Sequence, residues 1–314
     1  MLSTLTLAGD AIPKPIILSR RLDFPSRQCD YDLDEYITRP DWQPSPLPKD
    51  GHLSLHLGEC IAGGRSAVVY AAEISTAYEA GTIPLSNPHP LEQEFCVKIA
   101  RRNRCRTLAR EAWVCEQLRS RGQLQGVIAP RFYGFFTASL PDDQSAFPLW
   151  DADDFKLEIP DDDPTCDDPL PDDEPLEEEY DNGPGGRECS PWCDWRPDPN
   201  SPLLAVIVMS RGGATYTRED DADKANQKDI RAILDDLSRI YLWHGDLRPN
   251  NLVRAPAGTM LCKKHKRVHK WNIIDFAWTG VDDADSDVGG KSKLIRESQR
   301  ASYRGYYFWH GSLS

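Results

Sequence analysis

The chain has 314 residues, of which 39% are hydrophobic and 28% are charged, and its formal net charge is −13 at pH 7. No apolar run approaches the roughly 20 residues needed to span a bilayer, and the first ten residues lack a basic region and a sustained apolar core, so we expect neither a membrane protein nor a secreted one. Nine scattered cysteines without a paired CxxC arrangement favour a reduced, intracellular protein, cytoplasmic or nuclear.

The negative charge is concentrated in residues 141–200, which contain 21 Asp or Glu and 3 Lys or Arg, a local balance of −18. The rest of the chain therefore carries about +5, the difference between −13 and −18, which suits a body that handles a polyanionic nucleotide. Like charges at this density repel, and the many prolines prevent regular pairing. We therefore expect residues 141–200 to be an acidic, disordered insertion.

The first part of the chain changes character near residue 51. Residues 1–50 are rich in proline and are expected to form an irregular arm. Leucine then alternates with other residues over 53–57, which predicts a half-buried strand. A glycine-containing turn at 62–64 and a second strand at 67–72 complete a predicted hairpin.

The middle of the chain contains further apolar runs and helical spacings. Strands are predicted at 94–100, 128–136 and 203–209, and helices at 107–119 and 230–241.

Short apolar runs at 251–253 and 271–275 predict a second hairpin. The loop between them contains a basic cluster, residues 263–270. For this cluster we favour a solvated loop over contact with the acidic insertion or with an acidic partner. Residues 284–314 are expected to form a polar tail.

The segment that follows the second predicted helix contains the pattern H-x-D-x-x-x-x-N, from His244 to Asn251. It places the Asp246 carboxylate five residues before the Asn251 amide. In phosphoryl transfer a carboxylate orients a hydroxyl and accepts its proton, and an amide oxygen helps to hold Mg²⁺ beside the phosphates. The alternative is a polar turn after a helix.

A lysine, Lys98, lies within the apolar strand predicted at 94–100. Burying a lysine is costly without a partner. Its predicted partner is Glu111 on the following helix, with Glu116 as the alternative. If Lys98 were instead a surface residue, it would need neither.

A glycine hairpin, a strand lysine, the loop with Asp246 and Asn251, and Asp275 at a strand end follow one another in an order that resembles the protein-kinase-like superfamily. The resemblance covers about residues 52–283, with the acidic insertion inside it. It implies an α+β, bilobal fold with a β-rich N-lobe and a reduced α-helical C-lobe. In this division the N-lobe is 51–140, and the hinge and C-lobe are 201–283.

The resemblance also implies ATP and Mg²⁺ as cofactors and assigns roles to particular residues. Asp246 would be the catalytic base, with Arg248 near the γ-phosphate. Lys98 and Glu111 would position the phosphates, and Asn251 and Asp275 would bind the metal. The nucleotide would contact Ile61, Gly63, Gly64, Val69, Lys98 and Met209.

Several residues depart from the usual protein-kinase pattern and limit which kinds of kinase-like protein the chain resembles. Gly245 stands where most protein kinases have the arginine that reads a phosphorylated activation loop, which argues against that mode of switching. Ala62 and Ala67 replace two glycines of the glycine-rich loop. Ala277 replaces the last glycine of D-F-G, giving a string similar to the D-F-x-W-x-G variants of fungal kinase-like proteins. Only 39 residues follow Asp275 and no A-P-E motif is found, so we expect a minimal or truncated C-lobe.

The leading hypothesis is an ATP-dependent phosphotransferase that acts on a Ser- or Thr-type hydroxyl of an unknown acceptor, with proteins among the candidates. One alternative is a pseudokinase-like module that binds a nucleotide or a protein. Another is a small-molecule kinase, because His-Gly-Asp is common in enzymes of the aminoglycoside and choline kinase types. No nucleic-acid partner is expected, because no recognition module or aromatic interleaving accompanies the basic cluster.

Overall fold

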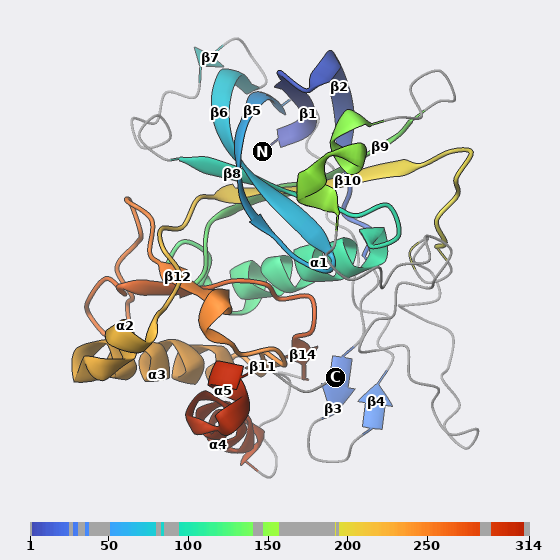
Figure 1. The fold of residues 1–314 in the computed structure, drawn as a ribbon. Helices are drawn as coiled ribbons and strands as arrows, with labels where there is room; N and C mark the ends of the chain where they lie inside the picture. The colour runs from blue at the N-terminus through green and yellow to red at the C-terminus, as the bar shows by residue number, and fades with distance from the viewer. Residues whose placement is uncertain are drawn as a thin grey trace.

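The computed structural model describes residues 2–24, 28–30, 35–37, 51–79, 83–84, 94–140, 147–156, 192, 195–282 and 290–310. These residues form an α+β fold, as expected. A large sheet occupies one end of the molecule and a group of helices occupies the other, with one long helix between them (Figure 1).

The large sheet has eight strands in the order β5-β1-β2-β9-β10-β8-β6-β7. Strand β5 also pairs with β6, so seven strands close into a ring. All neighbours are antiparallel except β1 and β5, which are parallel. The strands are β1 (Leu2–Gly9), β2 (Ile12–Arg20), β5 (Gly51–Gly63), β6 (Ala67–Glu79), β7 (Ile83–Pro84), β8 (Phe95–Ala100), β9 (Phe132–Ser139) and β10 (Leu203–Ser210).

The interior of this ring is apolar because alternate residues of each strand point inward. Leu5 and Leu7 of β1 meet Leu53 and Leu55 of β5, and all four are almost completely buried. The leucine alternation read from the sequence at 53–57 therefore marks the inner face of the ring.

The prediction that residues 1–50 are irregular is wrong for residues 2–20, which form β1 and β2. Pro13 and Pro15, which suggested an arm, are exposed. They lie in the part of β2 where no pairing with β9 occurs, since that pairing involves only Ser19 and Arg20. Proline is tolerated where a strand needs no hydrogen bond on that side. Two short strands, β3 (Gln28–Asp30) and β4 (Glu35–Ile37), follow, and the rest of the predicted arm beyond residue 24 lies outside the described residues.

The helices are α1 (Cys105–Gly122), α2 (Arg218–Ala222), α3 (Lys224–Arg239), α4 (Lys291–Arg304) and α5 (Tyr306–His310). Asp223 caps the start of helix α3, because its side chain accepts a hydrogen bond from the Ala225 backbone N–H at 2.8 Å. None of the described helices combines the length and the hydrophobicity that crossing a bilayer requires.

A second apolar cluster joins the sheet to the helices. Trp113 of α1 packs in this cluster with Phe135 and Ile207 from the sheet and with Ile233 and Leu237 of α3. Helix α1 therefore separates the sheet from the helical end of the molecule (Figure 1).

The prediction of a polar tail at 284–314 is wrong for residues 291–310, which form α4 and α5. Lys291, Ile295, Gln299 and Tyr303 recur every four residues and form the buried stripe of α4. Only one of these four is aliphatic, so the hydrophobic pattern did not reveal the helix. Residues 283–289 and 311–314 lie outside the described residues.

Disorder was predicted for residues 141–200, and this is wrong where the structure describes them. Residues 147–156 form two 3₁₀ turns, η2 (Pro148–Asp151) and η3 (Asp153–Phe155). Phe147, Trp150 and Phe155 join the apolar interior of the ring, and the Trp150 indole N–H donates to the Ala100 carbonyl at 3.1 Å. The density of acidic residues obscured these aromatic anchors. Most of 157–194 lies outside the described residues.

The basic cluster 263–270 is solvated at its four lysines, which are exposed as expected, but the loop also contacts α3. Arg267 lies 2.6 Å from Asp229 and Lys264 lies 3.5 Å from Asp236, and both carboxylates belong to α3. His269 is buried. The loop therefore packs on α3, and its charge is partly balanced there.

Candidate active site

The H-x-D-x-x-x-x-N segment lies between two small ladders that fix its ends. Strand β11 (Leu242–Trp243) precedes it and pairs with β14 (Gly280–Val281). Strand β12 (Leu252–Arg254) follows it and pairs with β13 (Trp271–Ile273), as the predicted hairpin required. The last turn of the segment is a 3₁₀ helix, η5 (Pro249–Asn251).

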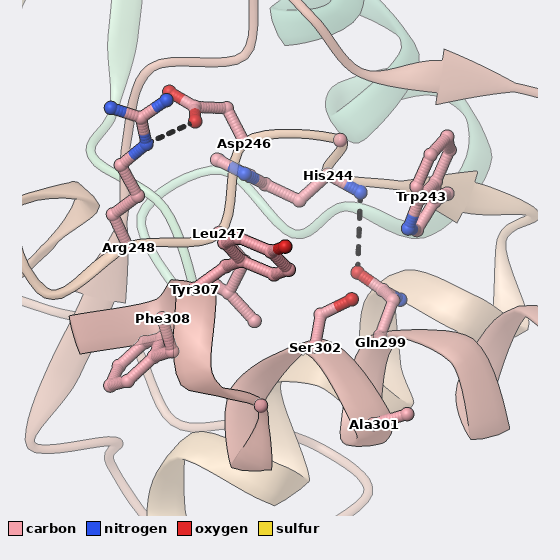
Figure 2. A pocket seen from close by; sticks show the side chains of 12 residues that line it. Trp243, His244, Asp246, Leu247, Arg248, Gln299, Ala301, Ser302, Tyr307 and Phe308 are labelled. Carbon is pink, nitrogen blue, oxygen red and sulfur yellow. Dashed lines mark hydrogen bonds and ion pairs between the residues drawn. The ribbon is translucent and has the colours of Figure 1, made fainter. Parts of the chain in front are cut away.

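His244 anchors the start of this loop. Its Nε2–H donates to the Ile274 carbonyl at 2.9 Å, and its backbone N–H donates to Gln299 Oε1 at 3.3 Å (Figure 2). The ring is buried, and burial lowers the pKa of His244, although the Ile274 carbonyl and nearby carboxylates raise it in part. A neutral imidazole therefore connects the loop to the segment that leads to Asp275.

Gly245 has a structural reason to be glycine. Its φ is +75°, and a Cβ placed on it would lie 2.1 Å from the Trp278 carbonyl oxygen. No other residue fits between these backbones without a shift. The absence of arginine here is therefore explained by the close approach of the Trp278 backbone to the loop.

The loop brings together three of the residues singled out by the sequence. Arg248 Nε donates to Asp246 Oδ1 at 2.5 Å (Figure 2). The Asn251 amide donates to the Asp246 backbone oxygen at 2.7 Å and to its Oδ2 at 3.2 Å. The Asp246 side chain remains 27% exposed, so the oriented carboxylate can still be reached from solvent.

Lys98 of β8 lies between two carboxylates. Its Nζ is 2.6 Å from Glu111 Oε2 on α1 and 2.8 Å from Asp275 Oδ1. Burial alone would lower the pKa of Lys98, but the two negative charges outweigh it and raise the pKa. The alternative partner, Glu116, instead lies near Arg20 and Arg119.

Asp275 combines strain with charge. Its φ is +64°, a left-handed conformation that is costly for a residue with a side chain. Burial would raise the pKa of its carboxyl, but Lys98 lowers it, so the group is ionised at neutral pH. The preceding residue holds it close to the loop, because the Ile274 N–H donates to the Asn251 carbonyl at 2.9 Å. A carboxylate and an amide oxygen on neighbouring segments form a donor set that fits Mg²⁺.

The predicted glycine hairpin is the β5–β6 turn. The Gly64 N–H donates to the Ala67 carbonyl at 2.9 Å, and Arg101 Nε, just after β8, donates to the Gly64 carbonyl at 2.9 Å. Ile61 is 39% exposed, and Gly63 and Gly64 are exposed too. Within the described residues no hydrogen bond joins this tip to the Lys98 cluster.

Two of the predicted nucleotide contacts lie in the strands that surround Lys98. Val69 of β6 is the register partner of Lys98, and Met209 of β10 is the register partner of Cys96. Val69, Lys98 and Met209 therefore belong to three adjacent strands, with Lys98 in the middle one.

A cavity of about 280 Å³ lies between the loop and the two C-terminal helices (Figure 2). Asp246 and Arg248 form one side of it, and Ser302, Tyr307 and Phe308 form the other. Sequence reasoning did not place the last three near Asp246, because the helices that carry them were not predicted. The cluster of aromatic residues at 303–309 was the one available signal.

No protein-family model matches the sequence, and no curated protein matches it. Among solved structures, a Stt7 homologue from Micromonas algae soaked with ATP is 14% identical, with 76% of this chain and 52% of that chain covered and a TM-score of 0.36. The BubR1 kinase domain is 12% identical, with 88% of this chain and 54% of that chain covered and a TM-score of 0.35. The chain thus spans about half the length of these structures, and TM-scores this low do not establish a shared fold.

Proposed function

We propose that this protein is an ATP-dependent phosphotransferase with a kinase-like arrangement of its site. The observation that carries the proposal is the position of Lys98 between Glu111 and Asp275, which lie on separate segments of the chain. Lys98 is only 13% exposed, and two carboxylates bind its ammonium group. They hold this positive charge in one position before any ligand binds. Phosphoryl transfer depends mainly on positioning and on charge stabilisation, which such a group supplies.

In this proposal Lys98 binds the α- and β-phosphates and Glu111 keeps it oriented. The nucleotide lies against the strands next to Lys98, where Val69 and Met209 are available, and under the hairpin tip formed by Ile61, Gly63 and Gly64. The predicted division into an N-lobe at 51–140 and a hinge and C-lobe at 201–283 stays part of the proposal, with β1 and β2 added to the N-lobe.

Asn251 and Asp275 are the residues that would hold Mg²⁺. The Asn251 amide nitrogen donates to Asp246, which leaves its side-chain oxygen to face a cation. Lys98 occupies Oδ1 of Asp275, which leaves Oδ2. Bound Mg²⁺ would supply neutralising charge to the phosphates.

Asp246 is proposed to orient the acceptor hydroxyl and to accept its proton. In the structure Arg248 binds Oδ1 of the Asp246 carboxylate. When the acceptor hydroxyl binds Asp246 instead, the Arg248 guanidinium would turn toward the transferred phosphate. The acceptor class proposed first is a Ser- or Thr-type hydroxyl. The cavity beside Asp246 favours a second candidate, a small hydroxyl-bearing molecule, because about 280 Å³ is close to the size of a small-ligand site.

The test is a titration of ATP with and without Mg²⁺, followed by turnover with water, a peptide library and a panel of small hydroxyl compounds as acceptors. The Asp246→Asn variant should bind Mg-ATP normally and lose turnover, whereas Glu219→Gln, an exposed acidic residue on α2, should retain both. Undiminished turnover in Asp246→Asn would remove Asp246 from its role. Metal-dependent binding without turnover in the unmodified protein would overturn the phosphotransferase and favour a nucleotide-binding module.

A further inference from the structure

Four potential metal ligands converge where the loop between β12 and β13 packs on α3. Asp236 comes from α3, and Cys262, His265 and His269 come from the loop between β12 and β13. Their ligand atoms all lie within 4.8 Å of one another. The spacing on the loop is C-x₂-H-x₃-H, which falls within the range used by zinc sites. Searching the sequence for paired CxxC alone could not find it.

Three of the distances between these atoms are those of a tetrahedron around a metal ion, a fourth is longer, and none exceeds 4.8 Å. Metal–ligand bonds of about 2.0–2.3 Å place neighbouring ligand atoms about 3.3–3.6 Å apart. Cys262 Sγ is 3.3 Å from His265 Nδ1 and 3.4 Å from Asp236 Oδ2. His265 Nδ1 is 3.3 Å from the same Oδ2, and His269 Nε2 is 3.9 Å from it.

His269 provides a second, independent observation. The residue is 1% exposed, and its Nε2 has no hydrogen-bond partner although it faces this cluster. Its other nitrogen, Nδ1, lies 2.8 Å from Asp229 Oδ1 and donates to it. That bond leaves the lone pair of a neutral imidazole on Nε2, and a carboxylate behind a histidine is the usual outer partner of a metal ligand. A buried acceptor without a donor is costly unless something fills its place.

The Asp236 carboxylate is also held from behind. Arg239 Nη2 donates to Oδ1 at 2.8 Å, while Oδ2 points at Cys262 and the two histidines. One carboxylate and one thiolate would balance the two charges of a divalent ion. This balance matters in a loop that also carries Lys263, Lys264 and Lys266.

We propose that Asp236, Cys262, His265 and His269 form a closed, four-coordinate site for Zn²⁺. A thiolate with two imidazoles favours zinc over magnesium or calcium, and four protein ligands leave no open position for catalysis. The ion clamps the β12–β13 loop onto α3. That loop joins the strand after Asn251 to the strand before Asp275, so the clamp stabilises the fold around both. The proposal does not depend on the proposed phosphotransferase function.

The first experiment measures zinc directly. The full chain, free of any histidine tag, is stripped with a chelator, dialysed against Zn²⁺ and analysed for metal and by native mass spectrometry. We expect one ion per chain that Cys262→Ser and His269→Gln each remove. The affinity for Zn²⁺ in these variants should fall by more than roughly 10–100-fold, which is the loss expected when a residue that only hydrogen-bonds a metal ligand is replaced. The matched controls are Cys60→Ser and His56→Gln, which alter a partly exposed cysteine and an exposed histidine elsewhere and should leave zinc binding unchanged.

A second measurement does not require a variant that folds. Co²⁺ added to the stripped, unmodified protein should give the absorption of a four-coordinate ion together with a thiolate-to-metal charge-transfer band, and Zn²⁺ should displace it. Zinc should also raise the unfolding temperature of the stripped protein, because ligands bind only the folded state well. The proposal is overturned if the unmodified protein retains no zinc and gives no thiolate band. It is overturned equally if folded Cys262→Ser and His269→Gln keep zinc with unchanged affinity.

Discussion

The side-chain oxygen of Gln299 accepts a hydrogen bond from the backbone N–H of His244 at 3.3 Å. The amide nitrogen of the same residue lies 3.2 Å from the Leu242 carbonyl and 2.7 Å from Ser238 Oγ. One buried glutamine on α4 therefore fastens the end of α3, strand β11 and the first residue of the loop that carries Asp246. This relationship makes α4 part of the support of the site.

Replacing Gln299 with leucine keeps the volume but leaves the His244 N–H and the Leu242 carbonyl without their partner. Each buried, unsatisfied polar group costs about 1–3 kcal/mol, so the loss of two partners should lower the free energy of unfolding by about 2–6 kcal/mol. Urea denaturation measures it. Glu297→Leu, an exposed position on the same helix, is the control. If both variants lose the same stability, Gln299 is not a fastening point.

Lys98→Met should destabilise the protein strongly, since it leaves Glu111, only 3% exposed, and Asp275 as uncompensated neighbouring charges. Removing one partner of a buried ion pair costs about 3–5 kcal/mol. The double variant Lys98→Met/Glu111→Gln should recover part of this loss, because the buried carboxylate is then neutral. Chemical denaturation of both single variants and the double variant gives the coupling energy.

Lys228→Met, an exposed lysine of α3, controls for the loss of one positive charge. Strictly additive effects of the two substitutions would contradict a coupled Lys98–Glu111 pair. If the phosphotransferase proposal is right, Lys98→Met should also weaken ATP binding, which is measured separately by titration under conditions where the variant is folded.

The elements that were predicted from the sequence are those with a regular spacing of apolar residues. The leucines at 53–57, the apolar run around Lys98 and the helical spacing from Ile230 to Tyr241 each predicted the right element. The pairing of Lys98 with Glu111 was predicted from the cost of burying a lysine and from the kinase-like order of motifs, because no local pattern reports which helix meets which strand.

The missed elements are those where tertiary contacts override composition. Pro13 and Pro15 concealed β2, since only the structure shows that this stretch needs no second neighbour. Helix α4 was missed because its buried stripe relies on Gln299 and Lys291 instead of aliphatic residues. The proposed zinc ligands were missed because Asp236 lies 26 residues from Cys262 along the chain, and only folding brings the two within 3.4 Å.

Gly245→Ala should destabilise the protein more than Gly258→Ala does. Both glycines have left-handed backbones, with φ of +75° and +81°, and a side chain in that conformation costs about 1–2 kcal/mol. At Gly258 a Cβ meets nothing within 4 Å, whereas at Gly245 it lies 2.1 Å from the Trp278 carbonyl oxygen. The difference in unfolding free energy between the two variants therefore isolates the backbone clash. Equal losses would show that the loop shifts at little cost and that packing does not require glycine at 245.

The buried His244 predicts a loss of stability in mild acid. Burial lowers its pKa in the folded protein, so the unfolded chain, with an ordinary histidine pKa of about 6.5, binds the proton first as pH falls. The contribution of His244 is complete above about pH 6.5 and declines toward its lowered folded pKa, with a limiting slope of about 1.4 kcal/mol per pH unit.

The variant His244→Gln removes this titration, while its amide can still donate to the Ile274 carbonyl. Urea unfolding is measured from about pH 5 to pH 7.5. The difference in unfolding free energy between the unmodified protein and His244→Gln should become smaller as pH falls, because only the unmodified protein loses this contribution. His56→Gln, an exposed position, corrects for the loss of a histidine, and a gap that stays constant across the range would show that His244 does not titrate in this way.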